Sequence, residues 1–287
     1  MDWISKKNIL IVGLGLMGGS YARGLKRLGF HVTAIDRDPE TVAWALDHDV
    51  VDQAYDHVEE AAVQDADAAI FALYPATFLK WIRDWQHLFK PGLMMTDVTG
   101  VKSCVVYDIQ AALRPDVEFI AAHPMAGREV SGVQNSDERI FRDANYIVVP
   151  TERNTPEAVE WCKSLGRILG FRHIAELSPP AHDEMIGFVS QLTHVIAVSL
   201  MTCSDNTHLV DYTGDSFRDL TRIARINDVM WSELFLMNRE PLLRQIDTFL
   251  KEMNGFRDML AAGDREGMRE KMRLSTQRRA LFTKPNP

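Results

Sequence analysis

The segment NILIVGLGLMGGS, residues 8–20, has a glycine-rich turn directly after a short apolar run. The apolar run, residues 8–12, predicts a buried strand, and residues 16–28 carry apolar side chains at helical spacing. A second apolar run, residues 31–35, ends at Asp36. This order of strand, glycine turn, helix and strand predicts a βαβ unit that binds a dinucleotide.

The glycines of this turn follow the pattern G-x-G-x-x-G, and each has a separate task. Gly13 permits the tight turn, Gly15 lets the backbone approach a pyrophosphate, and Gly18 lets the helix pack closely on the strand. The pyrophosphate would lie at the helix N-terminus, where unpaired N–H groups and the helix dipole favour an anion. We therefore expect cofactor contacts from the turn and from the end of the second strand: Gly13, Leu14, Gly15, Leu16, Met17, Gly18, Asp36 and Arg37.

The two residues after the second strand bear on the choice of cofactor. Asp36 would accept hydrogen bonds from the adenine ribose diol and repel a 2′-phosphate, which favours NAD. Arg37 favours NADP, because a guanidinium at that place could bind the phosphate. A glycine-rich turn without any ligand is the remaining alternative, and the βαβ context disfavours it.

Further apolar runs alternate with helical patterns as far as about residue 175. We expect strands at residues 68–73, 93–98, 117–122, 146–149 and 172–177, and helices at residues 76–88, 101–113 and 156–169. From about residue 178 the patterns are all helical, for example at residues 185–203, 218–237 and 240–262. The predicted fold class is α/β. A Rossmann-type doubly wound parallel sheet in residues 1–175 precedes an all-helical domain in residues 176–287, which we expect to bind substrate and to dimerise.

Composition and charge disfavour several classes of protein. The chain has 287 residues, of which 46% are hydrophobic, and its formal net charge of −8 disfavours non-specific binding to nucleic acid or an anionic membrane. Its three cysteines, Cys104, Cys162 and Cys203, are far apart, so we expect reduced thiols, no metal site and no disulfide. The first residues lack the layout of a secretory signal, so we expect a cytoplasmic protein.

Residues 185–204 contain no Asp, Glu, Lys or Arg, and such a run is long enough to span a bilayer. Four polar residues lie near its middle: Ser190, Gln191, Thr193 and His194. Lipid would leave their polar groups unpaired, which disfavours a membrane span. We expect instead a helix buried inside protein, in the interface of a homodimer.

One histidine lies where such sheets bind their ligands. The run VEFIAA, residues 117–122, stops at His123-Pro124, and ligands bind beyond the carboxyl ends of the strands. We expect Pro124 to end the strand and His123 to point toward the crevice that would hold a nicotinamide. A histidine with a pKa of about 6.5 suits the role of a general base. The alternative is a histidine that only caps a strand.

Two further residues are candidates with ordinary alternatives. His194 lies in the charge-free helix, where a lone histidine is more often a hydrogen-bonded core residue. Arg222 shares a helix face with Arg218, four residues earlier. Arg222 could bind a carboxylate bidentately. It could equally form a surface ion pair with Asp215 or Asp219.

Several segments form a specific set in chain order: GLGLMGGS, TDVTGVKS, HPMAGREVSG, SQLTH, SFRDLTRIA and MWSELFLMN. Together they resemble the prephenate dehydrogenase family over nearly the whole chain. The resemblance implies NAD-dependent oxidative decarboxylation of prephenate to 4-hydroxyphenylpyruvate, on the way to tyrosine.

The resemblance also implies roles for individual residues. His123 takes the proton of the ring hydroxyl as hydride leaves, and His194 positions the substrate. The carboxylate-binding arginine falls on Arg222, while Glu129 and Trp231 match positions near the substrate. Many members carry a serine in the turn D-x-G-S-V-K, and this chain has Gly100 in that place. Either Thr99 substitutes for the serine or the contact is absent.

Three alternatives stay open. Arogenate dehydrogenase belongs to the same family and would form tyrosine directly. A regulator that senses NAD without chemistry is of another class, and a DNA-binding version would need a basic recognition helix, which the net charge disfavours. A different β-hydroxyacid dehydrogenase would rely on a catalytic lysine, and no lysine stands out in the sequence.

Overall fold

The computed structural model describes residues 8–128 and 130–282. These form two compact units, one ending at Asn238 and the other beginning at Arg239. The domain boundary expected between residues 175 and 176 stays a prediction.

The first unit is built on a parallel sheet of six strands, in the order β3-β2-β1-β4-β5-β6. Alternate residues of each strand face opposite sides of a sheet, so Ile9 and Ile11 join one apolar core, while Leu10 and Val12 join the other. Burial on both faces explains why the strands appear as continuous apolar runs. The strands are β1 Asn8–Val12, β2 His31–Ile35, β3 Gln53–Tyr55, β4 Ala68–Phe71, β5 Met94–Asp97 and β6 Glu118–Phe119.

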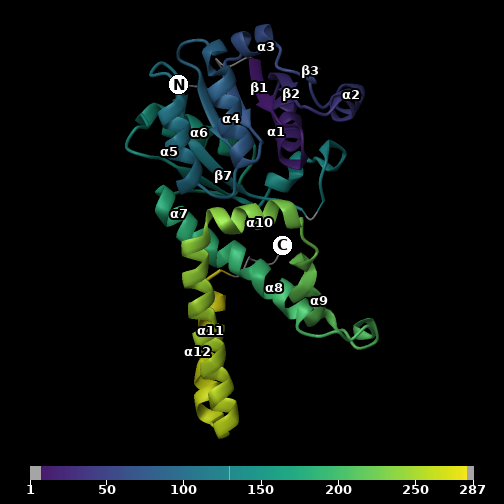
Figure 1. Ribbon diagram of the computed structural model, residues 1–287, viewed down its shortest axis with the longest axis vertical. Helices are drawn as coiled ribbons and strands as arrows, with labels where there is room; N and C mark the ends of the chain where they lie inside the picture. The colour runs from purple at the N-terminus through teal and green to yellow at the C-terminus, as the bar shows by residue number, and fades with distance from the viewer. Residues whose placement is uncertain (1–7, 129, 283–287) are drawn as a thin grey trace. The chain divides into compact units, whose positions relative to one another are not determined.

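Helices cover both faces of this sheet, as predicted for a doubly wound fold (Figure 1). One face carries α1 Leu16–Arg27, α2 Pro39–Asp47 and α6 Pro156–Ile168; the other carries α3 Glu60–Asp65, α4 Pro75–Trp85 and α5 Ser103–Ala112. The sequence analysis did not predict α2, α3 or β3. For α2 a local signal was present, because the Asp38 carboxylate accepts the Glu40 N–H and Pro39 begins the helix.

The single strand predicted at residues 117–122 is wrong. The segment divides into β6, at the edge of the parallel sheet, and β7 Ala121–Met125, which belongs to a second sheet. In that sheet β7 pairs antiparallel with β8 Asn145–Val149, and β8 pairs parallel with β9 His173–Glu176. The prediction that the last strands extend the parallel sheet is therefore wrong.

The expectation that Pro124 ends the strand is also wrong. Pro124 lies inside β7 and opposes Tyr146, while His123 opposes Ile147. A proline removes one ladder donor, and β7 tolerates this because it is an edge strand of its sheet. The residues before and after His123 are both paired with β8, so His123 is held more firmly than a residue at the end of a strand.

Helices complete the first unit: α7 Pro179–Ile186, a π-helical turn Gly187–Gln191, α8 Leu192–Thr202, α9 Asp215–Thr221 and α10 Asp228–Met237. The continuous helix predicted at residues 218–237 is wrong, because a 3₁₀ turn, Arg222–Ala224, follows α9 and α10 begins anew. Asn227 marks that start, since its side chain accepts the Met230 N–H at 3.0 Å.

Most of the charge-free run lies in the one described helical stretch, Pro179–Thr202, that is long and apolar enough to cross a membrane. Its polar middle is used within the protein: buried Gln191 donates to the Leu234 carbonyl at 3.1 Å and accepts from Asn238 at 2.6 Å. Within one chain only 28% of its most apolar window is buried, and its expected burial in a homodimer interface stays a prediction. Phe188 and Val189 are 56% and 46% exposed.

The second unit is a helical hairpin of α11 Arg239–Ala262 and α12 Arg265–Ala280. Gly263, with φ of +66°, forms the turn, and the Asp264 side chain caps α12 by accepting the Gly267 N–H. The helix predicted at residues 240–262 is confirmed. Several apolar side chains of α11 are exposed: Leu243, Leu250, Met253 and Leu260.

Candidate active site

The glycine turn has the geometry that a dinucleotide cradle requires. Gly13 has a φ of +96°, and a Cβ there would lie 2.5 Å from the Ala72 carbonyl oxygen. A Cβ on Gly18 would lie 1.8 Å from the carbonyl oxygen of Gly13. Side chains at these two positions would collide with backbone, so both glycines are needed for the turn itself.

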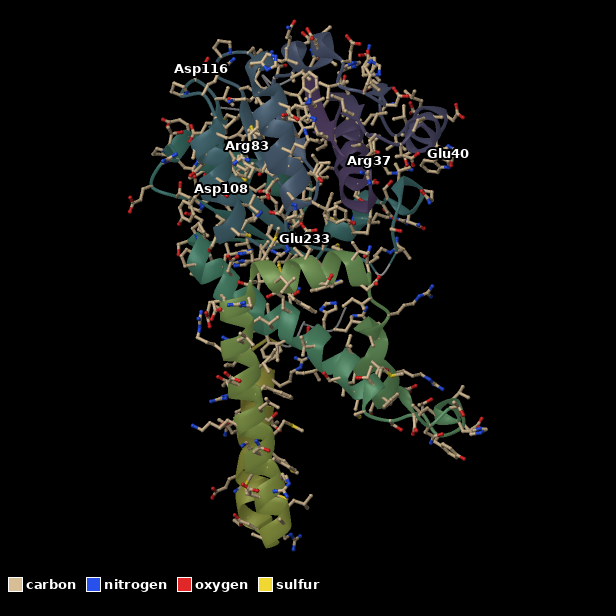
Figure 2. The ribbon with its side chains drawn as sticks, viewed as in Figure 1. Arg37, Glu40, Arg83, Asp108, Asp116 and Glu233 are labelled. Atoms are coloured by element: carbon tan, nitrogen blue, oxygen red, sulfur yellow. The ribbon has the colours of Figure 1, made fainter. Side chains whose placement is uncertain are left out.

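Gly15 is different, because a Cβ on it would meet nothing within 4 Å. It is the N-cap of α1, so the helix begins with no capping side chain from that residue. Open space beside uncapped helix N–H groups fits a pyrophosphate. At the end of β2, the Asp36 carboxylate accepts the Leu14 N–H at 2.6 Å, which ties the acidic side chain to the turn. Arg37 is exposed in the following loop (Figure 2).

The contrast between these glycines gives the first prediction. We expect Gly15→Ala to keep the melting temperature of the ligand-free protein and to raise the Kd for NAD by roughly tenfold or more, equivalent to about 1.4 kcal/mol. The methyl group would occupy the space where the pyrophosphate approaches the backbone. Thermal unfolding and calorimetric titration with NAD measure the two effects. Gly18→Ala is the matched control and should unfold at lower temperature. Unchanged NAD affinity in folded Gly15→Ala would place the cofactor elsewhere.

Two histidines and an aspartate form a chain of hydrogen bonds. His123 Nδ1 lies 2.9 Å from His182 Nε2, and His182 Nδ1 lies 2.8 Å from Asp183 Oδ1. His123 comes from β7 and is half-buried, whereas the other two residues come from α7 and are buried. The chain therefore connects the second sheet to the helical part of the first unit.

Asp183 also caps the N-terminus of another helix, α5. Its carboxylate oxygens accept the N–H of Lys102 at 2.8 Å and of Ser103 at 2.7 Å, at the start of α5. Burial alone raises the pKa of Asp183, but hydrogen bonds from His182 and Ser103 outweigh it and lower that pKa below its ordinary value. Asp183 is therefore an ionised acceptor at neutral pH.

Lys102 is fully buried beneath His123. Its Nζ donates to Asp97 Oδ2 at 2.7 Å, to Thr99 Oγ1 at 3.1 Å and to the Ala122 carbonyl at 2.6 Å. These contacts match the three N–H groups of an ammonium, which a buried charge requires. Burial lowers the pKa of Lys102, although the Asp97 charge opposes this. The hydroxyl group of Thr99 lies inside this network and also contacts Asp97.

These surroundings keep both imidazoles neutral. Burial, then the neighbouring His182 and Lys102, lower the pKa of His123 well below its ordinary value. Burial also lowers the pKa of His182, and the hydrogen bond with Asp183 opposes this only in part. The expectation of a His123 pKa near 6.5 is therefore revised downward, because the ring packs against His182 and Lys102 and loses part of its contact with water.

Gly100 lies beside the outer nitrogen of His123. A Cβ on Gly100 would be 3.9 Å from His123 Nε2 and 3.8 Å from Leu234 Cδ1. Leu234 belongs to α10, which in Figure 1 runs along the end of the α/β layers toward which the strands point. The Nε2 edge of His123 thus meets the turn after β5 on one side and α10 on the other.

Two of the remaining predicted residues, Trp231 and His194, meet at the same helix. Trp231 lies three residues before Leu234, so the two share a face of α10. The Trp231 and His194 rings pack with centroids 3.7 Å apart, and His194 Nδ1 donates to the Ser190 carbonyl at 2.9 Å. Arg222 is exposed in the 3₁₀ turn that packs against α8. Glu129 lies outside the described residues.

Three residues of the network were missed in the sequence analysis: Lys102, His182 and Asp183. The segment SPPAHDE was interpreted only as a helix start. Two titratable residues in succession, shortly after Pro179 and Pro180 begin α7, were a usable signal. Lys102 gave a weaker one, because a lysine after a polar turn is usually exposed.

Comparison with known proteins agrees with this architecture. Residues 21–174 match the prephenate dehydrogenase nucleotide-binding domain, and residues 178–274 match the prephenate dehydrogenase dimerization domain. The prephenate dehydrogenase of Bacillus subtilis is 31% identical over 271 residues, which cover 92% of this chain and 72% of that protein. The cyclohexadienyl dehydrogenase of Zymomonas mobilis is 27% identical over 95% of both chains.

A solved structure has the same fold over almost the full length. The prephenate dehydrogenase from A. aeolicus, in complex with hydroxyphenyl propionate and NAD⁺, superposes with a TM-score of 0.87 at 28% identity, covering 98% of this chain and all of that one. Both domains of one enzyme family are thus matched in order, on a fold with a dinucleotide cradle and a histidine site. The chain belongs to the prephenate dehydrogenase family.

Proposed function

We propose that the protein oxidises prephenate with NAD and releases carbon dioxide, giving 4-hydroxyphenylpyruvate for tyrosine biosynthesis in the cytoplasm. The observation that carries the proposal is the position of His123, whose Nε2 faces the turn after β5 and whose pKa burial lowers. Relatives from B. subtilis and A. aeolicus are named prephenate dehydrogenases, and the A. aeolicus structure contains NAD⁺, which supports the choice of substrate and cofactor.

In the proposed reaction His123 Nε2 accepts the proton of the ring hydroxyl, while the ring carbon that carries this hydroxyl loses a hydride. NAD, when bound in the glycine turn, supplies the hydride acceptor. Loss of the ring carboxylate as carbon dioxide leaves its bonding electron pair in the ring, which becomes aromatic, and the ring oxygen takes back the proton from His123 to give the phenol. The reaction therefore does not reverse. The base must be neutral to take the proton, and the low pKa of His123 ensures this at neutral pH.

The other predicted residues hold the substrate against the cofactor. Arg222 binds the side-chain carboxylate, and His194, stacked on Trp231, orients the ring. We propose Glu129 near the substrate on the family resemblance alone. Thr99 acts within the turn, where its hydroxyl is hydrogen-bonded to Asp97 and Lys102.

The missing serine of the turn gives the second prediction. A side chain at Gly100 would make only ordinary contacts, so Gly100→Ser should fold normally. Its hydroxyl would lie beside His123 Nε2, where it could bond the substrate hydroxyl. A neutral hydrogen bond contributes about 0.5–1.5 kcal/mol, so the KM for prephenate should fall by roughly two- to tenfold.

Gly100→Ala is the matched control, because it adds the carbon without the oxygen. Steady-state kinetics with prephenate compares the three proteins. Equal KM values for the serine and alanine variants would show that the turn makes no polar contact with the substrate.

Arogenate is the second candidate substrate. The Z. mobilis relative, 27% identical, is named a cyclohexadienyl dehydrogenase, a name that covers more than one ring substrate. Steady-state kcat/KM for prephenate and for arogenate, each with NAD and with NADP, tests the proposal. We expect prephenate with NAD to give the highest value, because Asp36 would repel a 2′-phosphate. Higher kcat/KM with NADP would mean that Arg37 determines the choice, and higher kcat/KM with arogenate would reassign the substrate.

We also propose a homodimer formed through the helical domain. The matched domain of residues 178–274 is described as a dimerization domain. The exposed side chains of Phe188 and Val189, in a run without charges, need a cover in water. A monomer in sedimentation at micromolar concentration would exclude this assembly.

A further inference from the structure

We propose that Asp183 and His182 are positioning residues that fix the ring proton of His123 on Nδ1 and leave Nε2 unprotonated toward the turn at Gly100. The inference rests on the proposed function, because it explains how the base is prepared. It assigns a role in the reaction to two buried residues.

The proton between Asp183 and His182 belongs to the histidine. Asp183 is ionised and accepts two backbone N–H groups at the start of α5. An ionised carboxylate only accepts hydrogen bonds. The contact of 2.8 Å between Asp183 Oδ1 and His182 Nδ1 therefore requires that His182 carries its proton on Nδ1.

The contact between the two histidine rings has a fixed donor and a fixed acceptor. His182 is fully buried and neutral, so it has one ring N–H, which Asp183 already uses. Its Nε2 can then only accept. The contact of 2.9 Å to His123 Nδ1 therefore requires a proton on that nitrogen of His123.

His123 is neutral as well, and its single ring proton is engaged with His182. Its Nε2 thus has a lone pair, and this edge lies beside Gly100. The opposite tautomer would present an N–H to the substrate hydroxyl and could not accept its proton.

The surroundings hold this arrangement. The charged groups around the two rings are Asp183 on α7, Lys102 before α5 and Asp97 at the end of β5. The Lys102 ammonium disfavours a second proton on His123, and Asp97 neutralises that ammonium at 2.7 Å. Asn238 donates to the Asp183 carbonyl at 2.9 Å, which fixes the backbone of α7.

Ring-proton spectra test the tautomers without any need for activity. We would label histidine ring nitrogens with ¹⁵N and record long-range ¹H–¹⁵N correlations at neutral pH, assigning signals from His123→Asn and His182→Gln. Both rings should show a protonated Nδ1 and an unprotonated Nε2. In Asp183→Asn, which loses the charged acceptor, the Nε2–H form should appear at both rings. A protonated Nε2 on His123 in the unaltered protein would overturn the inference.

Kinetics separates positioning from simple structural support. His182→Leu removes the acceptor for His123 Nδ1–H and should lower kcat by roughly tenfold or more, up to the 10²–10⁴ that a general base contributes. The KM for prephenate and the Kd for NAD should hardly change. His182→Gln offers an amide oxygen to the same N–H and should restore most of kcat. Equal kcat in the leucine and glutamine variants would overturn the inference. A protein without prephenate oxidation would refute the proposed function, while the spectra would still decide the tautomers.

Discussion

His123→Asn is expected to lower kcat for prephenate oxidation by roughly 10²–10⁴, with little change in the KM for prephenate. The asparagine amide can still donate to His182 Nε2, which His123 Nδ1 contacts at 2.9 Å, so the packing around α7 should persist. Its amide oxygen can accept a hydrogen bond but is far too weak a base to take the proton of the ring hydroxyl. The loss should therefore fall on the chemical step and not on binding.

Steady-state kinetics and thermal unfolding of the same preparation measure the two effects. An unchanged melting temperature together with the large loss of kcat would assign the loss to the missing base. A variant with near-normal kcat would show that His123 is structural. His194 would then be the next candidate, because its ring packs on Trp231 of α10 and its Nδ1 proton is held by the Ser190 carbonyl.

Arg222→Gln is expected to raise the KM for prephenate by roughly ten- to a hundredfold. A hydrogen bond to a charged group contributes about 1.5–3 kcal/mol, and glutamine cannot replace the paired donors of a guanidinium. The Kd for NAD should stay the same, because Arg222 belongs to the 3₁₀ turn after α9 and not to the glycine turn. Kinetics at varied prephenate and titration with NAD separate the two quantities.

Arg218→Gln is the matched control for this prediction. Arg218 lies four residues earlier, is exposed, and forms an ion pair with Asp215 at 3.4 Å. Surface pairs of this kind contribute little, so its KM should stay near that of the unaltered protein. If both variants raised KM equally, the effect would come from the general charge of this region and not from a carboxylate contact.

The parts of the fold that depend on neighbouring residues could be predicted. The cradle needs only a strand, three glycines and an acidic residue, all within residues 8–36, and the structure has them in that arrangement. The strand at residues 117–122 failed because its division depends on partners. β6 pairs with β5, whereas β7 pairs with β8, and no local pattern separates these choices.

Only part of the candidate site was predicted from the sequence, and the buried residues behind His123 were missed. His123 and Gly100 belong to recognisable segments, whereas His182 meets His123 across 59 positions of the chain. Asp183 meets Lys102 across 81 positions. The sequence shows the residue types but not which of them a fold buries together, and burial is the first cause of the low pKa of His123.

The pH dependence of kcat/KM for prephenate with NAD tests the central claim most directly, because it reports the pKa of the base in the free enzyme. The base works unprotonated, so activity is lost as the pH falls through its pKa. Burial, His182 and Lys102 lower that pKa, and we therefore predict an acid limb below pH 6.5 that is absent from the residual activity of His123→Asn. An acid limb at or above about pH 6.5 that persists in His123→Asn would contradict a neutral His123 as the base.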